Sequence, residues 1–227
     1  MTAFRTVYPD IIGAYEKIRF STKDLPESQF LYGEQAPEPL LVTENGVQFA
    51  TYLNEGLMTG IFLDQKEVRG RLVDGFAVGK TVLNMFSYTG AFSVAAAMGG
   101  AVATTSVDLA KRSLPKTTEQ FEVNHLNLAA QKIIVMDVFD YFKYASRKGL
   151  SYDMIILDPP SFARNKKKVF SVAKNYGELV KDSIDILTDK GTLIASTNAA
   201  NLSLAKYKKM VITALQEKNV RYKITDT

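Results

Sequence analysis

Short apolar runs alternate with stretches of helical hydrophobic spacing along most of the chain, from about residue 64 onward. The apolar runs predict strands at 81–86, 102–107, 132–136, 153–157, 191–196 and 221–225. The intervening stretches predict helices at 65–76, 91–98, 109–124, 138–147, 172–187 and 203–217. Because such strands pair in parallel through right-handed helical crossovers, the pattern predicts a Rossmann-like α/β domain, a mainly parallel sheet flanked by helices.

The first 60 residues follow a different pattern. Two apolar runs, 40–42 and 47–53, flank an Asn-Gly pair. An Asn-Gly pair between apolar runs is typical of a two-residue β-hairpin loop. We therefore expect two parts: residues 1–60 form a linker and a small N-terminal β-hairpin appendage, and residues 61–227 form the Rossmann-like domain.

Composition narrows the chemistry. The 227 residues include no stretch near the roughly 20 apolar residues that span a bilayer, and the N-terminus lacks the apolar core of a signal peptide. We expect a soluble, cytoplasmic protein. Because the chain has no cysteine and a single histidine, His125, the sequence excludes disulfides, thiolate zinc sites and a cysteine nucleophile, and no metal site is expected. Catalysis would depend on carboxylates, amides, hydroxyls, backbone groups or a bound cofactor.

The charge is unevenly distributed. The chain carries a net +4, yet residues 161–227 alone contain 13 basic and 6 acidic side chains, a net +7. The densest basic run contains Arg164, Lys166, Lys167 and Lys168. Two interpretations of this run are open at this point: a solvated lysine-rich face, or contact with a polyanion such as RNA.

Ligands of such sheets bind beyond the carboxyl ends of the strands, so the residues that follow each strand are candidates for a site. The first strand leads into a turn with one glycine, Gly90, where the backbone can approach a ligand and the next helix offers free N–H groups. The three-glycine dinucleotide fingerprint is absent. The turn therefore argues against a bound pyrophosphate and permits a smaller nucleoside, although a simple tight turn explains it equally well.

Acidic residues follow the next strands. Asp108 lies 22 positions beyond Phe86, at the offset where a Rossmann domain holds a ribose diol. Asp137 would accept a hydrogen bond from an exocyclic amine such as adenine N6, while the Val138 N–H would donate to a ring nitrogen. Helix capping and the helix dipole are alternative explanations for both acids.

The fourth strand is followed by a segment that combines several chemical groups, namely Asp158, Pro159, Pro160, Ser161 and Phe162. The two prolines restrict the backbone and remove two N–H donors, which leaves carbonyl groups as acceptors. The charge of Asp158, these carbonyls and the ring of Phe162 therefore lie on one rigid segment, called the proline rim below. Together with the glycine turn and the two other acids, this rim predicts a nucleoside ligand with a cationic part. S-adenosyl-L-methionine (SAM) fits, with its methionine ammonium near Asp158 and the first loop.

Five segments of the chain resemble one known family. They read LYGEQAPEPL, EGLMTGIFLDQKEVR, VLNMFSYTGAFSVAAAMGGA, SVDLAKRSL and LDPPSFA, within a resemblance that covers about residues 12 to 215. The family is that of the class I SAM-dependent 23S (large-subunit) rRNA methyltransferases with an N-terminal PUA domain. Two departures matter: the PUA domain is missing here, and relatives continue with a further strand, so we expect a methyltransferase domain truncated at its C-terminus.

The resemblance implies roles for individual residues. Asp108 would bind the ribose, Asp137 with Val138 the adenine, and Asp158 would serve both the methionine end of the cofactor and the target side. A first cofactor loop would consist of Phe86, Ser87, Tyr88, Thr89 and Gly90. A segment that closes over the cofactor would include Thr59, Phe62, Asp64 and Gln65.

The resemblance also bears on the methylated atom. Relatives that make 5-methylcytosine carry a cysteine after the fifth strand, because cytosine C5 needs a thiolate on C6 to activate it. Asn198 takes that place here, in the sequence STNA, whereas relatives that make N7-methylguanine read SNN. We therefore expect methyl transfer to a base nitrogen, with Asn198 bonded to the base edge and Phe162 stacked on it. The expected catalytic set is Asp158, Pro159, Pro160, Phe162 and Asn198.

These observations predict a SAM-dependent methyltransferase that binds and modifies 23S ribosomal RNA. The basic run directly follows the proline rim, where an RNA backbone would pass, so this position favours RNA contact for Arg164 and the three lysines. Two alternatives stay open: a methyltransferase for proteins or small molecules, and a catalytically silent RNA-binding module that keeps the fold. The basic C-terminal part weighs against the first alternative, and SAM binding would exclude the second.

Overall fold

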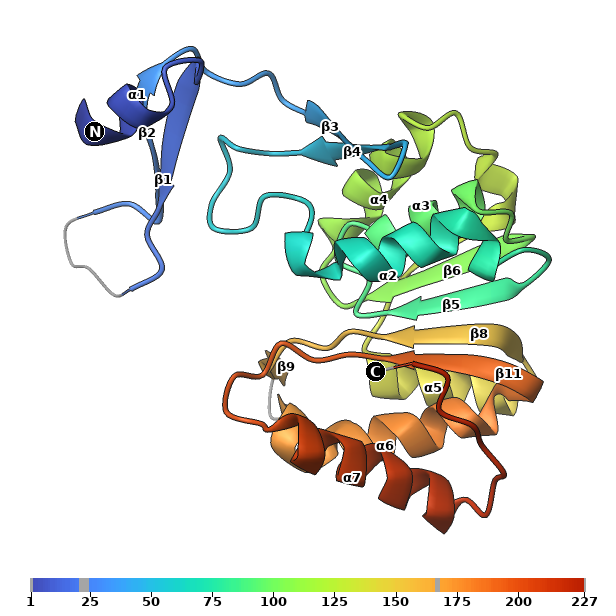
Figure 1. Cartoon of the computed structure of the whole chain (residues 1–227). Helices are drawn as coiled ribbons and strands as arrows, with labels where there is room; N and C mark the ends of the chain where they lie inside the picture. The colour runs from blue at the N-terminus through green and yellow to red at the C-terminus, as the bar shows by residue number, and fades with distance from the viewer. Residues whose placement is uncertain (1, 21–24, 166–167, 227) are drawn as a thin grey trace. The chain divides into compact units, whose positions relative to one another are not determined.

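The computed structural model describes residues 2–20, 25–165 and 168–226 and divides into two compact units, Met1–Glu67 and Val68–Thr227 (Figure 1). The elements of the first unit are α1 (Thr2–Val7), β1 (Gly13–Lys17), β2 (Ser28–Gly33), β3 (Leu40–Glu44), β4 (Val47–Thr51) and the 3-10 turn η1 (Leu63–Gln65). After α2 (Lys66–Arg71), the elements of the second unit are η2 (Leu72–Phe76), β5 (Thr81–Met85), α3 (Ala91–Met98), β6 (Ala103–Asp108), α4 (Ser113–Glu122), η3 (Leu128–Ala130), β7 (Gln131–Val135), α5 (Val138–Arg147), β8 (Tyr152–Leu157), β9 (Phe162–Asn165), β10 (Lys168–Ser171), α6 (Val172–Asp185), β11 (Leu187–Ala195) and α7 (Leu204–Glu217).

The first unit contains two antiparallel hairpins, β1 with β2 and β3 with β4. The second hairpin turns at Asn45 and Gly46, whose φ angles of 52° and 76° are those that a two-residue hairpin loop requires. The hairpin predicted from the Asn-Gly pair is therefore confirmed. The β1–β2 hairpin was not predicted, because its strands are only partly buried and their apolar residues show no clear alternation.

The second unit is built on a parallel sheet with the strand order β11-β8-β5-β6-β7. Five of the six predicted strands form it, and the helices predicted between them form its two outer layers. In Figure 1, η2, α3 and α4 lie on one face of this sheet, and α5, α6 and α7 lie on the other. The predicted Rossmann-like α/β fold is confirmed.

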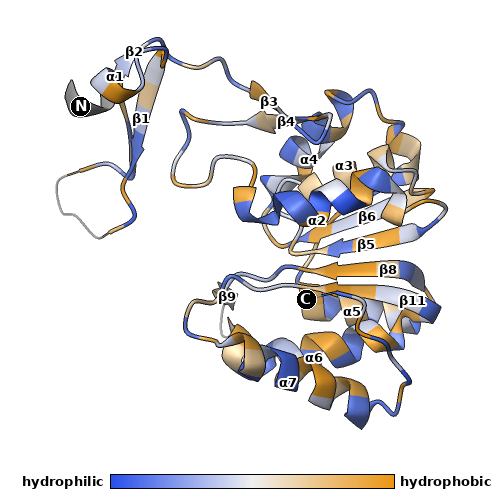
Figure 2. Ribbon diagram, viewed as in Figure 1, coloured by the Kyte–Doolittle hydropathy of each residue, from blue (hydrophilic) through white to orange (hydrophobic). Residues whose placement is uncertain are grey.

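The two central strands of this sheet, β5 and β8, are largely apolar on both faces. Val82 of β5 and Met154 of β8 pack with η2 and α3, whereas their chain neighbours Leu83 and Ile155 pack with α5 and α6. Figure 2 shows the result, since apolar colours dominate β5 and β8 over much of their length. Burial on both faces explains why the sequence shows continuous apolar runs here and no alternation.

One polar column crosses this apolar sheet. Asn84 of β5 donates through Nδ2 to Ser93 Oγ of α3 at 3.0 Å, and Ser93 Oγ lies 2.7 Å from Ser106 Oγ of β6. All three side chains are fully buried. Asn84 Oδ1 has no hydrogen-bond partner within the described part of the chain. The column ties two neighbouring strands and a helix together directly below the carboxyl end of β5.

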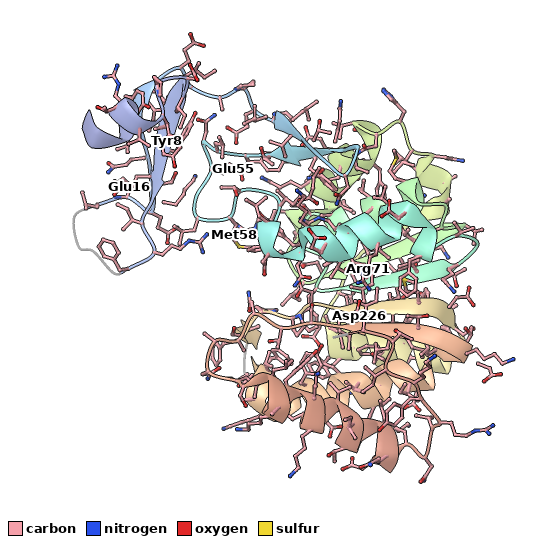
Figure 3. The ribbon with its side chains drawn as sticks, viewed as in Figure 1. Tyr8, Glu16, Glu55, Met58, Arg71 and Asp226 are labelled. Atoms are coloured by element: carbon pink, nitrogen blue, oxygen red, sulfur yellow. The ribbon has the colours of Figure 1, made fainter. Side chains whose placement is uncertain are left out.

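One predicted element was wrong. Residues 221–225 form no strand, since Tyr222 and Ile224 stay 44% and 52% exposed and offer little apolar surface to an edge of the sheet. The segment is instead attached by an ion pair between Asp226 and Arg71 of α2, both labelled in Figure 3. The helix predicted at 65–76 is confirmed over 66–76, where α2 continues into η2, a π-helical turn in which Gly75 adopts a φ of 98°.

An aspartate clamps the opposite, amino-terminal ends of the central strands. Asp153 Oδ2 accepts from the Thr81 N–H and hydroxyl at 2.9 and 2.8 Å, and Asp153 Oδ1 accepts from Thr188 Oγ1 at 3.0 Å. These hydrogen bonds, the Thr81 N–H first, lower the pKa of Asp153 below its ordinary value of 3.8.

The lowered pKa predicts a pH-dependent contribution of Asp153 to stability. The contribution is complete above the ordinary pKa and is lost as the pH falls through the lower folded value, because the unfolded chain then binds the proton more readily. Asp153→Asn should lower the Tm by a few degrees at pH 7 and by much less near pH 2, measured by circular dichroism. A Tm difference that is the same at both pH values would contradict the assignment.

Within the described residues, no helix is long and apolar enough to cross a membrane.

Candidate functional site

The loop after β5 has an unusual backbone. Phe86 and Tyr88 have positive φ angles of 58° and 52°, and Gly90 has 79°. Two backbone hydrogen bonds hold the loop, from the Ser87 N–H to the Val107 carbonyl at 3.0 Å and from the Gly90 N–H to the Ser87 carbonyl at 2.7 Å. Positive φ at non-glycine residues is uncommon and concentrates at binding sites. The predicted first cofactor loop is therefore a fixed, strained structure.

Gly90 ends this loop and precedes the first turn of α3. A Cβ atom at this position would lie 2.5 Å from Thr117 Cγ2 of α4, closer than real Cβ atoms approach other heavy atoms. The contact with α4 therefore requires glycine, and the positive φ favours it. The same arrangement leaves the first N–H groups of α3 at the carboxyl edge of the sheet.

We predict that Gly90→Ala lowers both the Tm and the affinity for SAM, because the loop must shift to relieve the contact with Thr117. Gly79→Ala is the matched control, since Gly79 also has positive φ (70°) but would meet no atom within 4 Å. The control should show only backbone strain, about 1 kcal/mol, with unchanged SAM affinity by calorimetric titration. Equal affinity losses in both variants would contradict this account.

Asp108, the last residue of β6, is fastened to this loop. Its Oδ2 accepts from the Tyr88 N–H at 2.9 Å and its Oδ1 from the Ala110 N–H at 2.8 Å. A carboxylate offers about four lone-pair positions, so each oxygen can also accept from a ribose hydroxyl. The structure thus brings together two parts of the predicted site that lie about 20 residues apart in sequence.

Asp137 caps the N-terminus of α5. Its Oδ1 accepts from the N–H groups of Phe139 and Asp140 at 3.1 and 3.4 Å. The Val138 N–H lies at the first position of the helix, where a backbone N–H has no acceptor within the helix itself. The capping alternative is therefore realised, and the role proposed for Asp137 and Val138 in binding adenine stays a prediction.

The proline rim after β8 meets the loop after β11. Ser196 Oγ donates to Asp158 Oδ1 at 2.6 Å, and Ser161 Oγ donates to Asn198 Oδ1 at 3.0 Å. Phe162, the first residue of β9, is 58% exposed, so its ring can stack on a ligand. The two parts of the predicted target site, 40 positions apart between Asp158 and Asn198, are thus neighbours.

Pro159 is buried and packs inside the protein, whereas Pro160 is exposed and forms part of the surface of the rim. On either side of residues 166–167, β9 pairs with β10 in antiparallel orientation, a pairing that hydropathy did not predict. Arg164 and Lys168 lie on these two strands, whereas Lys166 and Lys167 lie outside the described residues. Contact of the run with RNA stays a prediction.

The predicted closing segment belongs to the first unit. The Thr59 carbonyl accepts from the Tyr52 N–H at 2.9 Å, and Asp64 and Gln65 lie in η1, which follows Phe62. Its role in closing over the cofactor stays a prediction for Thr59, Phe62, Asp64 and Gln65.

Sequence reasoning missed three hydroxyl groups of the second unit. Ser196 is the last residue of the strand predicted at 191–196, whereas β11 ends at Ala195 and leaves Ser196 in the loop, where it reaches Asp158. Tyr176 of α6 donates to the Ser196 carbonyl at 2.9 Å, and Tyr207 of α7 donates to Tyr176 at 2.7 Å. Both tyrosines occupy apolar positions of amphipathic helices, so no sequence signal separates them from ordinary core residues.

The residues at this edge suit SAM. Ser87 Oγ is buried in the first loop without a hydrogen-bond partner among the described residues, an arrangement that structures rarely keep without a ligand or water nearby. The carboxylates at this edge can accept hydrogen bonds from the ribose hydroxyls and the ammonium group of SAM. The turn has a single glycine and not the three that bind a pyrophosphate, which SAM lacks. Asp108, Asp137, Val138 and Asp158 would hold the cofactor there.

Comparison with known proteins agrees with this geometry. A family model described as S-adenosylmethionine-dependent methyltransferase matches residues 17–209. The chain belongs to this family. Bacillus subtilis YwbD, provisionally named a ribosomal RNA large subunit methyltransferase, is 54% identical over 219 residues, which are 96% of this chain and 55% of YwbD. The ribosomal RNA large subunit methyltransferase of Deinococcus radiodurans is 34% identical over 199 residues, which are 88% of this chain and 48% of that protein.

The chain therefore spans about half the length of the curated relatives it matches. Among solved structures, SMU.776 complexed with SAH is 59% identical and superposes with a TM-score of 0.89, over 94% of this chain and 55% of that one. SAH is what remains of SAM after its methyl group is transferred. Family membership confirms the predicted family, fold and cofactor.

Proposed function

We propose that this protein transfers the methyl group of SAM to a nitrogen of a base in large-subunit ribosomal RNA. The observation that carries the proposal is the pairing of Ser161 with Asn198 beside Asp158, which gathers an amide, a carboxylate and an exposed aromatic ring at the SAM-binding edge. Bound SAM supplies an electrophilic methyl group. The names of the relatives, which assign them to large-subunit ribosomal RNA, support this class of substrate.

The residues favour a nitrogen acceptor over a carbon. A cytosine C5 acceptor would need a thiolate, and the chain contains no cysteine. A ring nitrogen such as guanine N7 already has a lone pair, so the work left to the residues is to hold the base in line with the methyl group.

Asn198 suits guanine in particular. Because its Oδ1 accepts from Ser161, its Nδ2 group is left to donate to an acceptor on the base edge. Guanine O6, next to N7, is such an acceptor. Phe162 would stack on the base, which must leave a paired stem at a cost of a few kcal/mol.

The charge of the chain supports an RNA partner. The net +7 of residues 161–227 would neutralise phosphates, and the hairpin with Arg164 and Lys168 directly follows the proline rim. We propose that this hairpin contacts the RNA backbone. A ribosomal RNA substrate would place the reaction in the cytoplasm.

The proposal is tested by incubating the protein with methyl-labelled SAM and, in parallel, with unmodified 23S rRNA or with ribosomal proteins, followed by mass spectrometry of the nucleosides and the proteins. We expect labelled N-methylguanosine, and no label with the Asp108→Ala variant. Label in ribosomal protein but not in RNA would favour a protein methyltransferase. RNA binding without SAM binding would favour a catalytically silent module, and either result would overturn the proposal.

A further inference from the structure

Two buried tyrosines lie behind the proline rim. Tyr176 of α6 is fully buried, and Tyr207 of α7 packs edge-to-face against it with ring centroids 4.9 Å apart. The Tyr207 hydroxyl donates to the Tyr176 hydroxyl at 2.7 Å. Because each phenol has one proton, this bond leaves the Tyr176 proton for another acceptor.

The acceptor is the carbonyl of Ser196, which lies where the ends of β8 and β11 are hydrogen-bonded to each other. Tyr176 OH donates to the Ser196 carbonyl at 2.9 Å and lies 3.4 Å from the Leu157 carbonyl. The Ser196 N–H itself donates to the Leu157 carbonyl at 2.9 Å. Leu157 is the last residue of β8, and Ser196 follows the last residue of β11. The hydroxyl of Tyr176 therefore holds the backbone at the point where the two site loops begin.

The side chain of Ser196 connects this fixed backbone to Asp158. Its Oγ lies 2.6 Å from Asp158 Oδ1 and 3.2 Å from the Leu157 carbonyl. Serine has one proton to donate, and the bond to the charged carboxylate is the shorter and stronger of the two. The position of Ser196 therefore sets the direction in which Asp158 presents its carboxylate.

The two phenols stay protonated at physiological pH. Burial raises the pKa of Tyr176 well above its usual range, and burial likewise raises the pKa of Tyr207. A buried hydroxyl adds cost to a core unless it is hydrogen-bonded, and phenylalanine would fill the same space without that cost. Because both hydroxyls are hydrogen-bonded, they connect α7 and α6 to the backbone just after β11, a connection that phenylalanine rings could not make.

We propose that Tyr176, supported by Tyr207, is a positioning residue that acts through Ser196 to hold the Asp158 carboxylate for the methionine end of SAM. The inference rests on the placement of Asp158 at the methionine end under the proposed function. It assigns these three hydroxyls to the cofactor site, although Tyr176 and Tyr207 lie behind it in the core.

The test compares two ligands by calorimetric titration without RNA. SAH contains the methionine-derived end, whereas 5′-methylthioadenosine keeps the nucleoside and lacks the amino acid. Tyr176→Phe and Ser196→Ala should each weaken SAH binding about 5- to 10-fold and change 5′-methylthioadenosine binding less than about twofold. The variant with both substitutions should bind SAH only slightly more weakly than the weaker of the two single variants, because Tyr176 and Ser196 act on the same carboxylate.

Tyr152→Phe is the matched control. Tyr152 begins β8 at the opposite end from Leu157, and its hydroxyl pairs with that of Tyr141 in the same apolar core. The control should leave the affinity for both ligands unchanged. Unchanged SAH affinity in Tyr176→Phe, or equal losses for both ligands, would overturn the inference. Since the titration contains no RNA, failure of RNA methylation would refute the proposed function without deciding this result.

Discussion

Replacing Asp108 with alanine is expected to weaken SAM binding about 100-fold. The carboxylate accepts hydrogen bonds from the backbone of the first loop and from Ala110, and it is the group proposed to hold the ribose hydroxyls. The variant would lose charge-assisted bonds to the ligand, each worth roughly 1.5–3 kcal/mol, together with an anchor of the loop. Calorimetric titration with SAM measures the change directly.

Asp153→Ala separates ligand binding from stability in this experiment. Asp153 also accepts a backbone N–H, that of Thr81 at 2.9 Å, but it does so at the amino-terminal end of the same sheet. Both alanine variants should therefore have a lower Tm, whereas only Asp108→Ala should lose SAM affinity. If wild type and Asp108→Ala bind SAM equally well, the assignment of the ribose to Asp108 is wrong.

Replacing Asn198 with alanine is expected to reduce methyl transfer to RNA about 100-fold while SAM affinity changes less than about twofold. The amide is held by Ser161 on the target side of the rim, so its loss misplaces the base and leaves the cofactor contacts in place. Single-turnover transfer with saturating SAM reports the rate, and titration reports the affinity.

Ser161→Ala provides the comparison for Asn198. It leaves the amide present but free to turn, so the rate should fall by a smaller factor, about 5- to 10-fold. A parallel loss of rate and SAM affinity in Asn198→Ala would instead place this residue on the cofactor side and contradict its proposed role.

The fold was largely readable from hydropathy. The central strands β5 and β8 are buried on both faces, which leaves nearly continuous apolar runs, and Asn45-Gly46 is a known signal for a two-residue hairpin loop. The β1–β2 and β9–β10 hairpins were missed because short, half-exposed or charged strands carry no such pattern. Residues 221–225 have strand-like composition, but strand formation also needs a neighbouring strand, which composition does not show.

The site was readable only in part. Acids that directly follow strands were found because parallel strands end at one edge, and the structure places Asp108 beside the first loop as expected. The partners that orient these groups were not found. Tyr176 and Ser196 lie 20 positions apart and meet only through packing of α6 on the sheet, a tertiary contact that neither residue signals alone.

The polar column under the first loop lowers the stability of the core but fixes how its strands and helix are aligned. Among the residues that the structure describes, the Asn84 amide oxygen has no hydrogen-bond partner, at a cost of about 1–3 kcal/mol that an aliphatic side chain would avoid. Aliphatic contacts, however, tolerate sliding, whereas the directional bonds from Asn84 to Ser93 and on to Ser106 permit one alignment of β5, α3 and β6. The protein is therefore less thermally stable than an all-aliphatic core would make it, but the carboxyl end of β5, where the first loop begins, is held in a single position.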